Sequence, residues 1–169
     1  IVPFYKKMVQ LGIPLLSHTG QERAFADAND LYGDPQRLKL PLSLGVTVIA
    51  AHIATTGEIE SQRNFDRILP MFREFPNLYT DISSLTQANK LNYLTEALEQ
   101  LDLHDRMIYG SDWPLQFSPL VSSFYHINHI SLADAKAASS YASQWDRDVV
   151  LKERLGVPTA VFERSRTLL

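Results

Sequence analysis

The stretch Val46-Thr47-Val48-Ile49-Ala50-Ala51-His52 decides the expected fold, because six β-branched or apolar residues lead directly into an imidazole. An apolar run of this length without polar alternation is typical of a strand that is buried on both faces, as in parallel sheets. Leu44-Gly45 supplies a turn just before it. We therefore predict a strand that presents His52 at its carboxyl end.

Three further segments have the same form, in which an apolar strand runs into a polar side chain. The first of them, residues 13–18, is also expected to be buried on both faces. The three segments are Ile13-Pro14-Leu15-Leu16-Ser17-His18, Leu78-Tyr79-Thr80-Asp81-Ile82-Ser83-Ser84 and Arg106-Met107-Ile108-Tyr109-Gly110-Ser111-Asp112.

Helical spacing of apolar residues separates these strands. A polar and mostly helical stretch, broken by Gly33-Asp34-Pro35, also links the first two strands. The predicted helices span residues 1–11, 59–75, 89–103 and 159–169, and the third is expected to bury a stripe of Leu91, Leu94, Leu98 and Leu101.

The alternation of strands and helices predicts a parallel sheet built from βαβ crossovers. The polar strand ends are His18, His52, Asp81 and Asp112, and successive members lie 34, 29 and 31 residues apart. This period matches the roughly 31 residues of one unit of a TIM barrel. A doubly wound open sheet gives the same alternation, and the length of 169 residues suits it better.

Strand ends of a parallel sheet converge at one edge, where ligands bind. Two imidazoles and one or two carboxylates at that edge could hold a divalent cation and activate a water molecule. Each residue taken singly also has a structural explanation: a buried hydrogen-bonded histidine, or an aspartate that caps a helix. The recurrence along successive strands favours a functional site.

Composition excludes several classes of protein. The chain is 45% apolar and 21% charged with a formal charge of −3, so it is neither disordered nor a basic nucleic-acid or anionic-membrane binder. The absence of cysteine leaves His and carboxylate as metal ligands. No apolar stretch approaches the roughly 20 residues of a membrane span, and we expect a cytoplasmic protein.

Residues 15–20, 48–52, 78–83 and 107–114 resemble, in order and spacing, the second half of the amidohydrolase superfamily. The resemblance is to its "amidohydrolase 2" branch, which includes aminocarboxymuconate semialdehyde decarboxylase and related metal-dependent hydrolases. The most specific element is Tyr109-Gly110-Ser111-Asp112-Trp113-Pro114. The resemblance implies a TIM-type (β/α)8 barrel, of which residues 1–169 carry the last four β/α units and the C-terminal helices as a single domain.

The same resemblance implies roles for three residues. His18 corresponds to the metal-ligand histidine of the fifth barrel strand, and His52 to the catalytic histidine of the sixth. Asp112 corresponds to the eighth-strand aspartate, which touches the metal and shuttles protons. The implied cofactor is a divalent metal, with Zn²⁺ expected, and the implied reaction is hydrolysis of an amide or lactone of a small carboxylate substrate, or its decarboxylation.

The chain departs from the family pattern, because the first-strand His-x-His that supplies two metal ligands is absent and the site is incomplete. His126 and His129 are spaced i, i+3 after the last strand, and we interpret them as surface or packing residues. Arg23 and Lys90 could meet an acidic substrate, although surface charge is the simpler interpretation. The chain begins at Ile1 without an initiator Met, so we expect a fragment of a longer protein.

Two hypotheses follow. The first is an enzyme of the amidohydrolase superfamily that acts on a small molecule. The alternative is a non-catalytic half-barrel or open-sheet domain for binding or assembly. An open half-barrel has two unpaired sheet edges, so association through these edges, for example as a homodimer, is expected. A phosphate-binding domain is disfavoured because no Gly-rich phosphate loop follows any strand.

Overall fold

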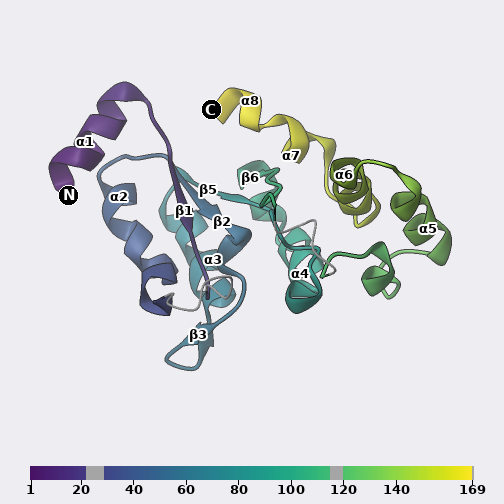
Figure 1. Cartoon of the computed structure of the whole chain (residues 1–169). Coiled ribbons are helices and arrows are strands. Elements are labelled where there is room, and N and C mark those ends of the chain that lie inside the picture. Colours follow the sequence, from purple (N-terminus) through teal and green to yellow (C-terminus); the bar gives the residue numbers. More distant parts are fainter. Residues whose placement is uncertain (22–28, 115–119, 169) are drawn as a thin grey trace.

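The computed structural model of the chain describes residues 1–21, 29–114 and 120–168. Its main sheet has four parallel strands, hydrogen-bonded in the order in which they follow along the chain (Figure 1). A doubly wound sheet reverses its strand order, whereas a (β/α)8 barrel does not. The α/β fold with four barrel-type strands is confirmed. The strands are β1 (Leu15–His18), β2 (Val48–Ala51), β5 (Leu78–Asp81) and β6 (Met107–Ile108).

Helices precede each strand of the main sheet and follow the last one (Figure 1). The α-helices are α1 (Val2–Leu11), α2 (Lys39–Ser43), α3 (Asn64–Glu74), α4 (Tyr93–Leu98), α5 (Leu132–Ser140), α6 (Gln144–Arg154), α7 (Thr159–Glu163) and α8 (Ser165–Leu168). Short 3₁₀ helices lie at η1 (Asp30–Gly33), η2 (Pro35–Leu38), η3 (His52–Ala54), η4 (Ala88–Lys90), η5 (Leu101–Arg106) and η7 (Ser123–His126).

The hydrophobic core forms around β2, whose four residues are all buried as the apolar run predicts. Helix α3 packs against β5, and α7 packs against β6. One continuous cluster of buried side chains reaches from Met8 on α1 to Val161 on α7. This core fixes the positions of the strands, and so of the residues at their ends.

Strand β1 differs from the prediction, because it is not buried on both faces. Leu16 is 64% exposed and His18 is exposed as well. Within the described residues β1 pairs with β2 on one side only, so no neighbouring strand covers its other side. The apolar run predicted the strand correctly, but its burial depends on a neighbour that local sequence does not reveal.

The predicted helix over residues 59–75 is wrong in its first turn. Residues 58–63 instead form a small antiparallel hairpin, β3 (Glu58–Ile59) and β4 (Gln62–Arg63), and α3 begins at Asn64. Glu60 and Ser61 have φ angles of 53° and 60°, which suit a tight hairpin turn and are incompatible with a right-handed helix.

The predicted helix over residues 89–103 is also wrong, because it is divided into η4, α4 and the start of η5. Asn92 has a φ of 72°, and this left-handed residue ends the first piece. Leu94 is buried, but Leu101 is 74% exposed and Leu91 is 38% exposed, so the leucine stripe does not face the core as a whole. The terminal helix predicted over residues 159–169 is likewise divided, into α7 and α8.

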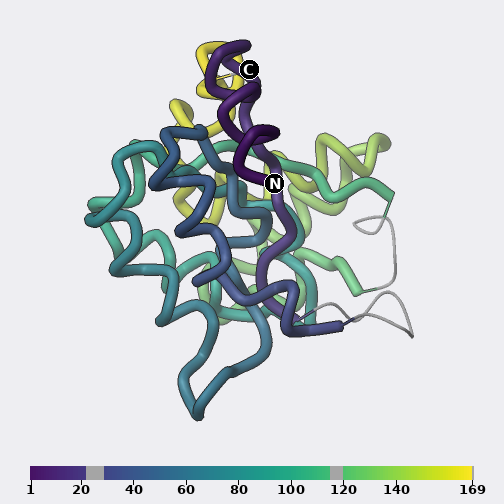
Figure 2. Tube along the Cα trace, turned by 90° about the vertical axis from the view of Figure 1, so that its left-hand side faces the viewer, coloured from purple at the N-terminus to yellow at the C-terminus, as the bar shows by residue number. Residues whose placement is uncertain are grey.

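The carboxyl ends of the strands lie at one end of the molecule. The β3–β4 hairpin projects at the end toward which β1 runs (Figure 2). None of the helices in the described part of the chain has the length and apolarity that crossing a bilayer requires.

Candidate functional site

The four polar residues singled out at the strand ends lie along one edge of the sheet. His18 is the last residue of β1 and pairs in register with Ala51, the residue before His52. Asp81 is the last residue of β5 and pairs with Ile108 of β6, four residues before Asp112. The parallel register therefore brings side chains from across the chain to one place.

The two histidines contact each other at this edge. The ring centroids of His18 and His52 are 5.2 Å apart, with an angle of 66° between the ring planes. His52 is only 7% exposed, whereas His18 is exposed. Of the two imidazoles, His52 is thus the more deeply buried.

The backbone after β2 turns sharply to place His52. Three consecutive residues, His52, Ile53 and Ala54, have φ angles of 62°, 47° and 52°. Non-glycine residues adopt this left-handed region at a cost, and such residues cluster at functional sites. Thr19 next to His18 stabilises the turn, because its hydroxyl donates to the carbonyl of Ala51 at 2.6 Å and accepts from the amide of Ala54 at 2.9 Å.

Asp81 and Ser83 fix the orientation of His52. One carboxylate oxygen of Asp81, Oδ1, accepts hydrogen bonds from the backbone amides of His52 and Ser83, both at 3.0 Å. The same oxygen accepts from the Ser83 hydroxyl. Ser83 Oγ lies 2.7 Å from Nδ1 of His52. Sequence analysis did not single out Ser83, although its place two residues after a strand-end aspartate was a usable signal.

This network determines the tautomer of His52. A serine hydroxyl has one hydrogen, and Ser83 gives it to Asp81. Ser83 Oγ must therefore accept from Nδ1–H of His52, and the backbone carbonyl of Ser83 lies 3.2 Å from the same nitrogen. The neutral imidazole then carries its lone pair on Nε2, the atom that faces Asp112.

Burial lowers the pKa of the His52 imidazole below 6.5, and the Lys90 cation lowers this pKa further. The carboxylates of Asp81 and Asp112 raise the pKa but do not offset the decrease. The side chain is consequently neutral near pH 7 and can accept a proton or a metal ion through Nε2.

Asp112 approaches His52 from the segment after β6. Its Oδ1 lies 4.0 Å from His52 Nε2, and its Oδ2 accepts a hydrogen bond from the hydroxyl of Ser84. Asp112 has a φ of 55° and Ser84 a φ of 60°. Among the described residues, Asp112 is followed by a turn at Trp113 and Pro114, and no helix starts there.

The donor types at this edge are those that a catalytic zinc ion accepts, imidazole nitrogen and carboxylate oxygen. A catalytic zinc site usually has three protein ligands. Within residues 1–21, 29–114 and 120–168, however, no three His, Cys, Asp or Glu side chains are grouped closely enough to hold a metal ion. His18, His52 and Asp112 thus fit the metal in kind, and the described residues do not complete its ligand set.

The surface-charge interpretation of Lys90 is wrong, because this residue in η4 is 9% exposed and its charge acts on His52. Arg23 lies outside the described residues. His126 is a packing residue that is 3% exposed, with Nε2 3.0 Å from the carbonyl of Thr86. His129 is exposed and contacts Asn92.

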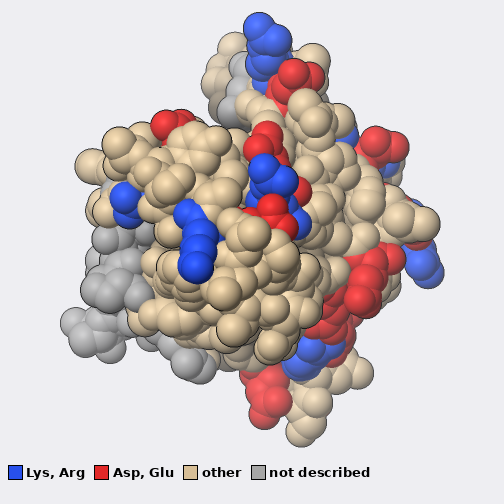
Figure 3. Space-filling model, turned by 90° about the vertical axis from the view of Figure 1, so that its right-hand side faces the viewer, with Lys and Arg blue, Asp and Glu red and all other residues tan. Residues whose placement is uncertain are grey.

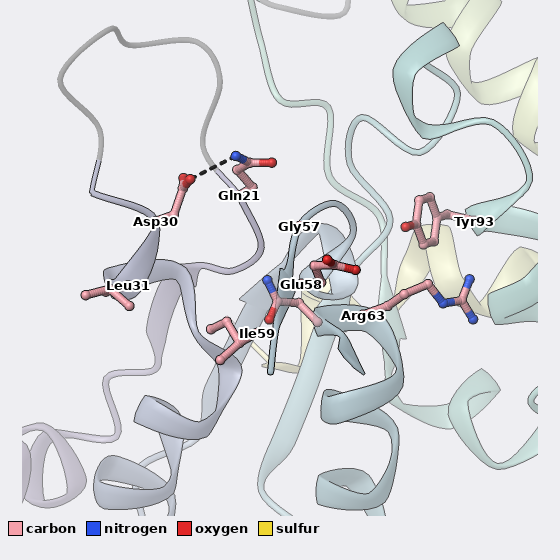
Figure 4. A pocket seen from close by; sticks show the side chains of 9 residues that line it. Gln21, Asp30, Leu31, Gly57, Glu58, Ile59, Arg63 and Tyr93 are labelled. Atoms are coloured by element: carbon pink, nitrogen blue, oxygen red, sulfur yellow. Dashed lines mark hydrogen bonds between the residues drawn. The ribbon is translucent and has the colours of Figure 1, made fainter. Parts of the chain in front are cut away.

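A separate pocket of about 450 Å³ opens among the loops that follow β1 and β2 (Figure 4). Gln21 donates to Asp30 at 2.9 Å on one side, and Tyr93 and Arg63 line the other side. Arg63 already donates to the carboxylates of Asp66 and Glu96. Its charge is therefore satisfied within the protein. The pocket lining does not include His18, His52 or Asp112.

Comparison with solved structures identifies a protein of similar fold. The chain is similar to a Pseudomonas putida protein designated a 2-pyrone-4,6-dicarboxylic acid hydrolase, with a TM-score of 0.54 and 15% identity. The match covers 98% of this chain and 55% of that protein, so the chain spans about half the length of its structural relative. A search of curated proteins finds no match.

The family comparison covers the part of the chain that carries the four strands of the main sheet. The model of the amidohydrolase family matches residues 2–130, a span that contains all four strands together with His18, His52, Asp81 and Asp112. Members of this family are generally metal-dependent. From its sequence match over most of its length and from its barrel-type strand order, the chain belongs to the amidohydrolase family.

Proposed function

We propose that residues 1–169 form a single domain, the carboxyl-terminal half of a metal-dependent hydrolase that cleaves a C–O or C–N bond in a small carboxylate substrate. The observation that carries this proposal is the arrangement of His52. Its Nε2 lone pair faces Asp112 Oδ1 at 4.0 Å, beside the ring of His18. A buried neutral imidazole next to a carboxylate is suited to proton transfer near pH 7.

The proposed roles follow from the contacts. His18 and Asp112 would hold the metal together with ligands beyond those described, and a bound Zn²⁺ would lower the pKa of water and polarise the substrate carbonyl. Asp112 is the proposed proton acceptor, since Ser84 occupies only its Oδ2. His52 Nε2, which carries the lone pair, would accept a hydrogen bond from the attacking water or take up the proton in transit. In lactone cleavage the oxygen of a water molecule bonds to the acyl carbon while Asp112 takes a proton from that water. The acyl C–O bond then breaks, and Asp112 returns the proton to the leaving oxygen.

The substrate class is proposed from two observations. The structural relative is designated a hydrolase of 2-pyrone-4,6-dicarboxylic acid, which is a lactone with two carboxylates. In this chain the buried Lys90 is close enough to shift the pKa of His52. A carboxylate group of the substrate near Lys90 would place its reacting carbonyl toward His52 and Asp112.

The test is hydrolysis of 2-pyrone-4,6-dicarboxylate and of simple amides and lactones by the purified protein, before and after removal of metal by chelation. We expect chelation to abolish turnover, and Zn²⁺ to restore it. His18→Ala should lower the measured zinc content. Asp112→Asn should lower kcat by roughly 100-fold or more, because a positioned general base contributes about that much.

His129→Gln is the matched control, because this exposed histidine lies outside the strand-end site and should leave turnover unchanged. Release of CO₂ without ring opening would replace hydrolysis by decarboxylation at the same site. Unchanged zinc content and turnover in both His18→Ala and Asp112→Asn would contradict the proposal.

A second candidate is a non-catalytic domain for binding or assembly. The observation that favours it is the lack, among the described residues, of a three-ligand metal group. A protein that binds no zinc and turns over none of these substrates would support it against the hydrolase.

A further inference from the structure

A fully buried ion pair lies on α6, outside the strand-end site. Asp148 and Lys152 are one helical turn apart, and the carboxylate oxygen Oδ2 lies 2.7 Å from Nζ. Their exposed fractions are 2% and 0%. On the side of the molecule that carries α5 and α6, other charged side chains stand on the surface in small mixed groups (Figure 3). The pair on α6 differs from them, because both of its charged side chains are buried away from water.

Burying two charges costs desolvation free energy, which is offset only when further hydrogen bonds satisfy the pair. Here the bonds come from the segments that follow β5 and β6. Asp148 accepts from the hydroxyl of Tyr109 at 2.9 Å and from that of Thr86 at 3.1 Å. Lys152 Nζ donates to the carbonyl of Gly110 at 3.3 Å and lies 4.8 Å from the centroid of the Tyr109 ring.

These two segments are the ones that carry the candidate site. Thr86 follows Ser84, whose hydroxyl donates to Asp112, and Gly110 precedes Asp112 by two residues. The pair therefore connects one helix to both sides of the Ser84–Asp112 contact.

Gly110 is held from the opposite side as well. A Cβ at this position would lie 3.1 Å from Cβ and Cγ of Asp81 and from Cβ of Ser83. The Gly110 backbone thus packs directly against the two residues that orient His52, while its carbonyl bonds to Lys152. A shift of this backbone would move Asp112 relative to His52.

We propose that Lys152, neutralised by Asp148, is a positioning residue that holds the Gly110 carbonyl and so fixes Asp112 relative to His52. The part of this inference that concerns turnover rests on the proposed function, whereas the part that concerns the backbone does not. Lys152 touches no reacting atom, and it acts through the segment from Gly110 to Asp112.

The experiment compares two neutral double variants of the protein. Lys152→Met/Asp148→Asn removes the donor to Gly110, whereas Lys152→Gln/Asp148→Asn keeps a donor at position 152. In both variants the amide side chain introduced at position 148 can still bond to Tyr109 and Thr86. Lys136→Met on the neighbouring helix α5 is the control for loss of an exposed lysine.

Four quantities are measured: the backbone chemical shifts of Gly110, Ser111 and Asp112, the Zn²⁺ affinity by calorimetry, kcat and KM. In the methionine double variant we expect shift changes at all three residues and weaker Zn²⁺ binding. Its kcat should fall roughly 10- to 100-fold with little change in KM, because a misplaced catalytic group costs about that much. The glutamine double variant should recover part of each quantity, and Lys136→Met should match the wild type.

Thr86→Val separates positioning from general stability. It removes one hydroxyl bond to Asp148 and leaves the contact between Lys152 and Gly110, so it should lower the melting temperature without lowering kcat. A folded methionine double variant with unchanged shifts at residues 110–112 would overturn the inference, whatever the activity. Inactivity of the wild-type protein would overturn the proposed function alone, since the shifts still report on the backbone.

A measurement on the unmodified protein covers the case in which the double variants do not fold. The Nζ protons of Lys152 should be protected from exchange and show a nuclear Overhauser effect to the α-protons of Gly110. Rapid exchange with no such effect would also overturn the inference.

Discussion

The tautomer of His52 follows from the fact that the Ser83 hydroxyl has a single hydrogen to donate. Because Ser83 donates to Asp81, it must accept from Nδ1–H of His52, and the reactive lone pair is left on Nε2. Sequence reasoning found His52 and Asp81 from their strand-end positions. It could not find their connection, because the left-handed turn at His52 and the pairing with Ser83 depend on the neighbouring strand β5.

Lys90 gives a prediction about substrate charge. Replacing Lys90 by Met should raise KM for a carboxylated lactone by roughly tenfold or more, because a hydrogen bond to a charged group contributes about 1.5–3 kcal/mol. KM for a neutral lactone should change little. Steady-state kinetics on both substrates check this, with the exposed Lys136→Met as control. Equal changes in KM for the two substrates would show that Lys90 does not bind the carboxylate.

His126 gives a prediction about stability and pH. Burial lowers the pKa of this imidazole below 6.5, and the neighbouring His129 lowers the pKa further. In the unfolded chain the histidine binds a proton as pH falls through about 6.5, whereas in the folded chain it binds this proton only at a lower pH. Because the unfolded state then binds more protons, the free energy of unfolding should fall as pH drops below about 6.5.

Urea denaturation at about pH 7.5 and pH 5.5 measures this effect. His126→Gln should reduce the loss of stability between the two pH values, while His129→Gln should reduce it less, since His129 is exposed. If His126→Gln loses as much stability as the wild type over this range, the burial of His126 does not control the acid response.

At the scale of the elements, glycines set how closely the loops after β1 and β2 can approach. A Cβ at Gly20 would lie 2.1 Å from the carbonyl oxygen of Thr55, and Gly20 has a φ of +93°. Both residues follow the strand ends that carry His18 and His52. This close approach keeps the two loops together beside the candidate site.

Gly20→Ala should therefore destabilise the fold by roughly 3 kcal/mol or more, in the upper range of single substitutions. Gly12→Ala is the matched control, because Gly12 also has a positive φ, +64°, but its Cβ would meet nothing within 4 Å. That variant should cost only about 1–2 kcal/mol, the cost of a left-handed alanine. Urea midpoints of the two variants check the difference, and equal values would mean that the loops separate without cost.

Two of the errors in predicting the elements have a shared physical cause. The hairpin of β3 and β4 and the break at Asn92 both interrupt sequences whose apolar spacing is helical. Periodicity reports which side chains could face a core, and it does not report backbone turns made by non-glycine residues with positive φ. The four strands of the main sheet were predicted better, since each is a short apolar run with turn residues beside it.

At the scale of the whole molecule, the edge of the sheet at β1 exposes apolar surface. Leu16 on β1 is 64% exposed, and Phe4 and Leu11 on α1 are 60% and 57% exposed. Unpaired strand edges and apolar patches promote association. We therefore predict that the protein of 169 residues self-associates through β1, and that Leu16→Lys increases the monomer fraction.

Size-exclusion chromatography with light scattering at several concentrations measures the association. Leu101→Lys is the matched control, because Leu101 is 74% exposed but lies in η5. This helix directly precedes β6, the strand at the opposite edge of the sheet from β1. A mass near 19.2 kDa at every concentration would contradict the prediction. An equal gain in the monomer from both variants would show that general surface charge, and not the β1 edge, controls association.

The amino-acid sequence by itself determined the parallel α/β class, the four strands and the candidate residues at their ends, because apolar runs and their spacing are local properties of the chain. Tertiary structure alone decided between a barrel-type and a doubly wound strand order. It also decided the burial of Lys90 and the tautomer of His52. These features depend on contacts between residues about 30 or more positions apart, such as His52 with Asp81 and Lys152 with Gly110. Such contacts exist only after the strands have found their neighbours.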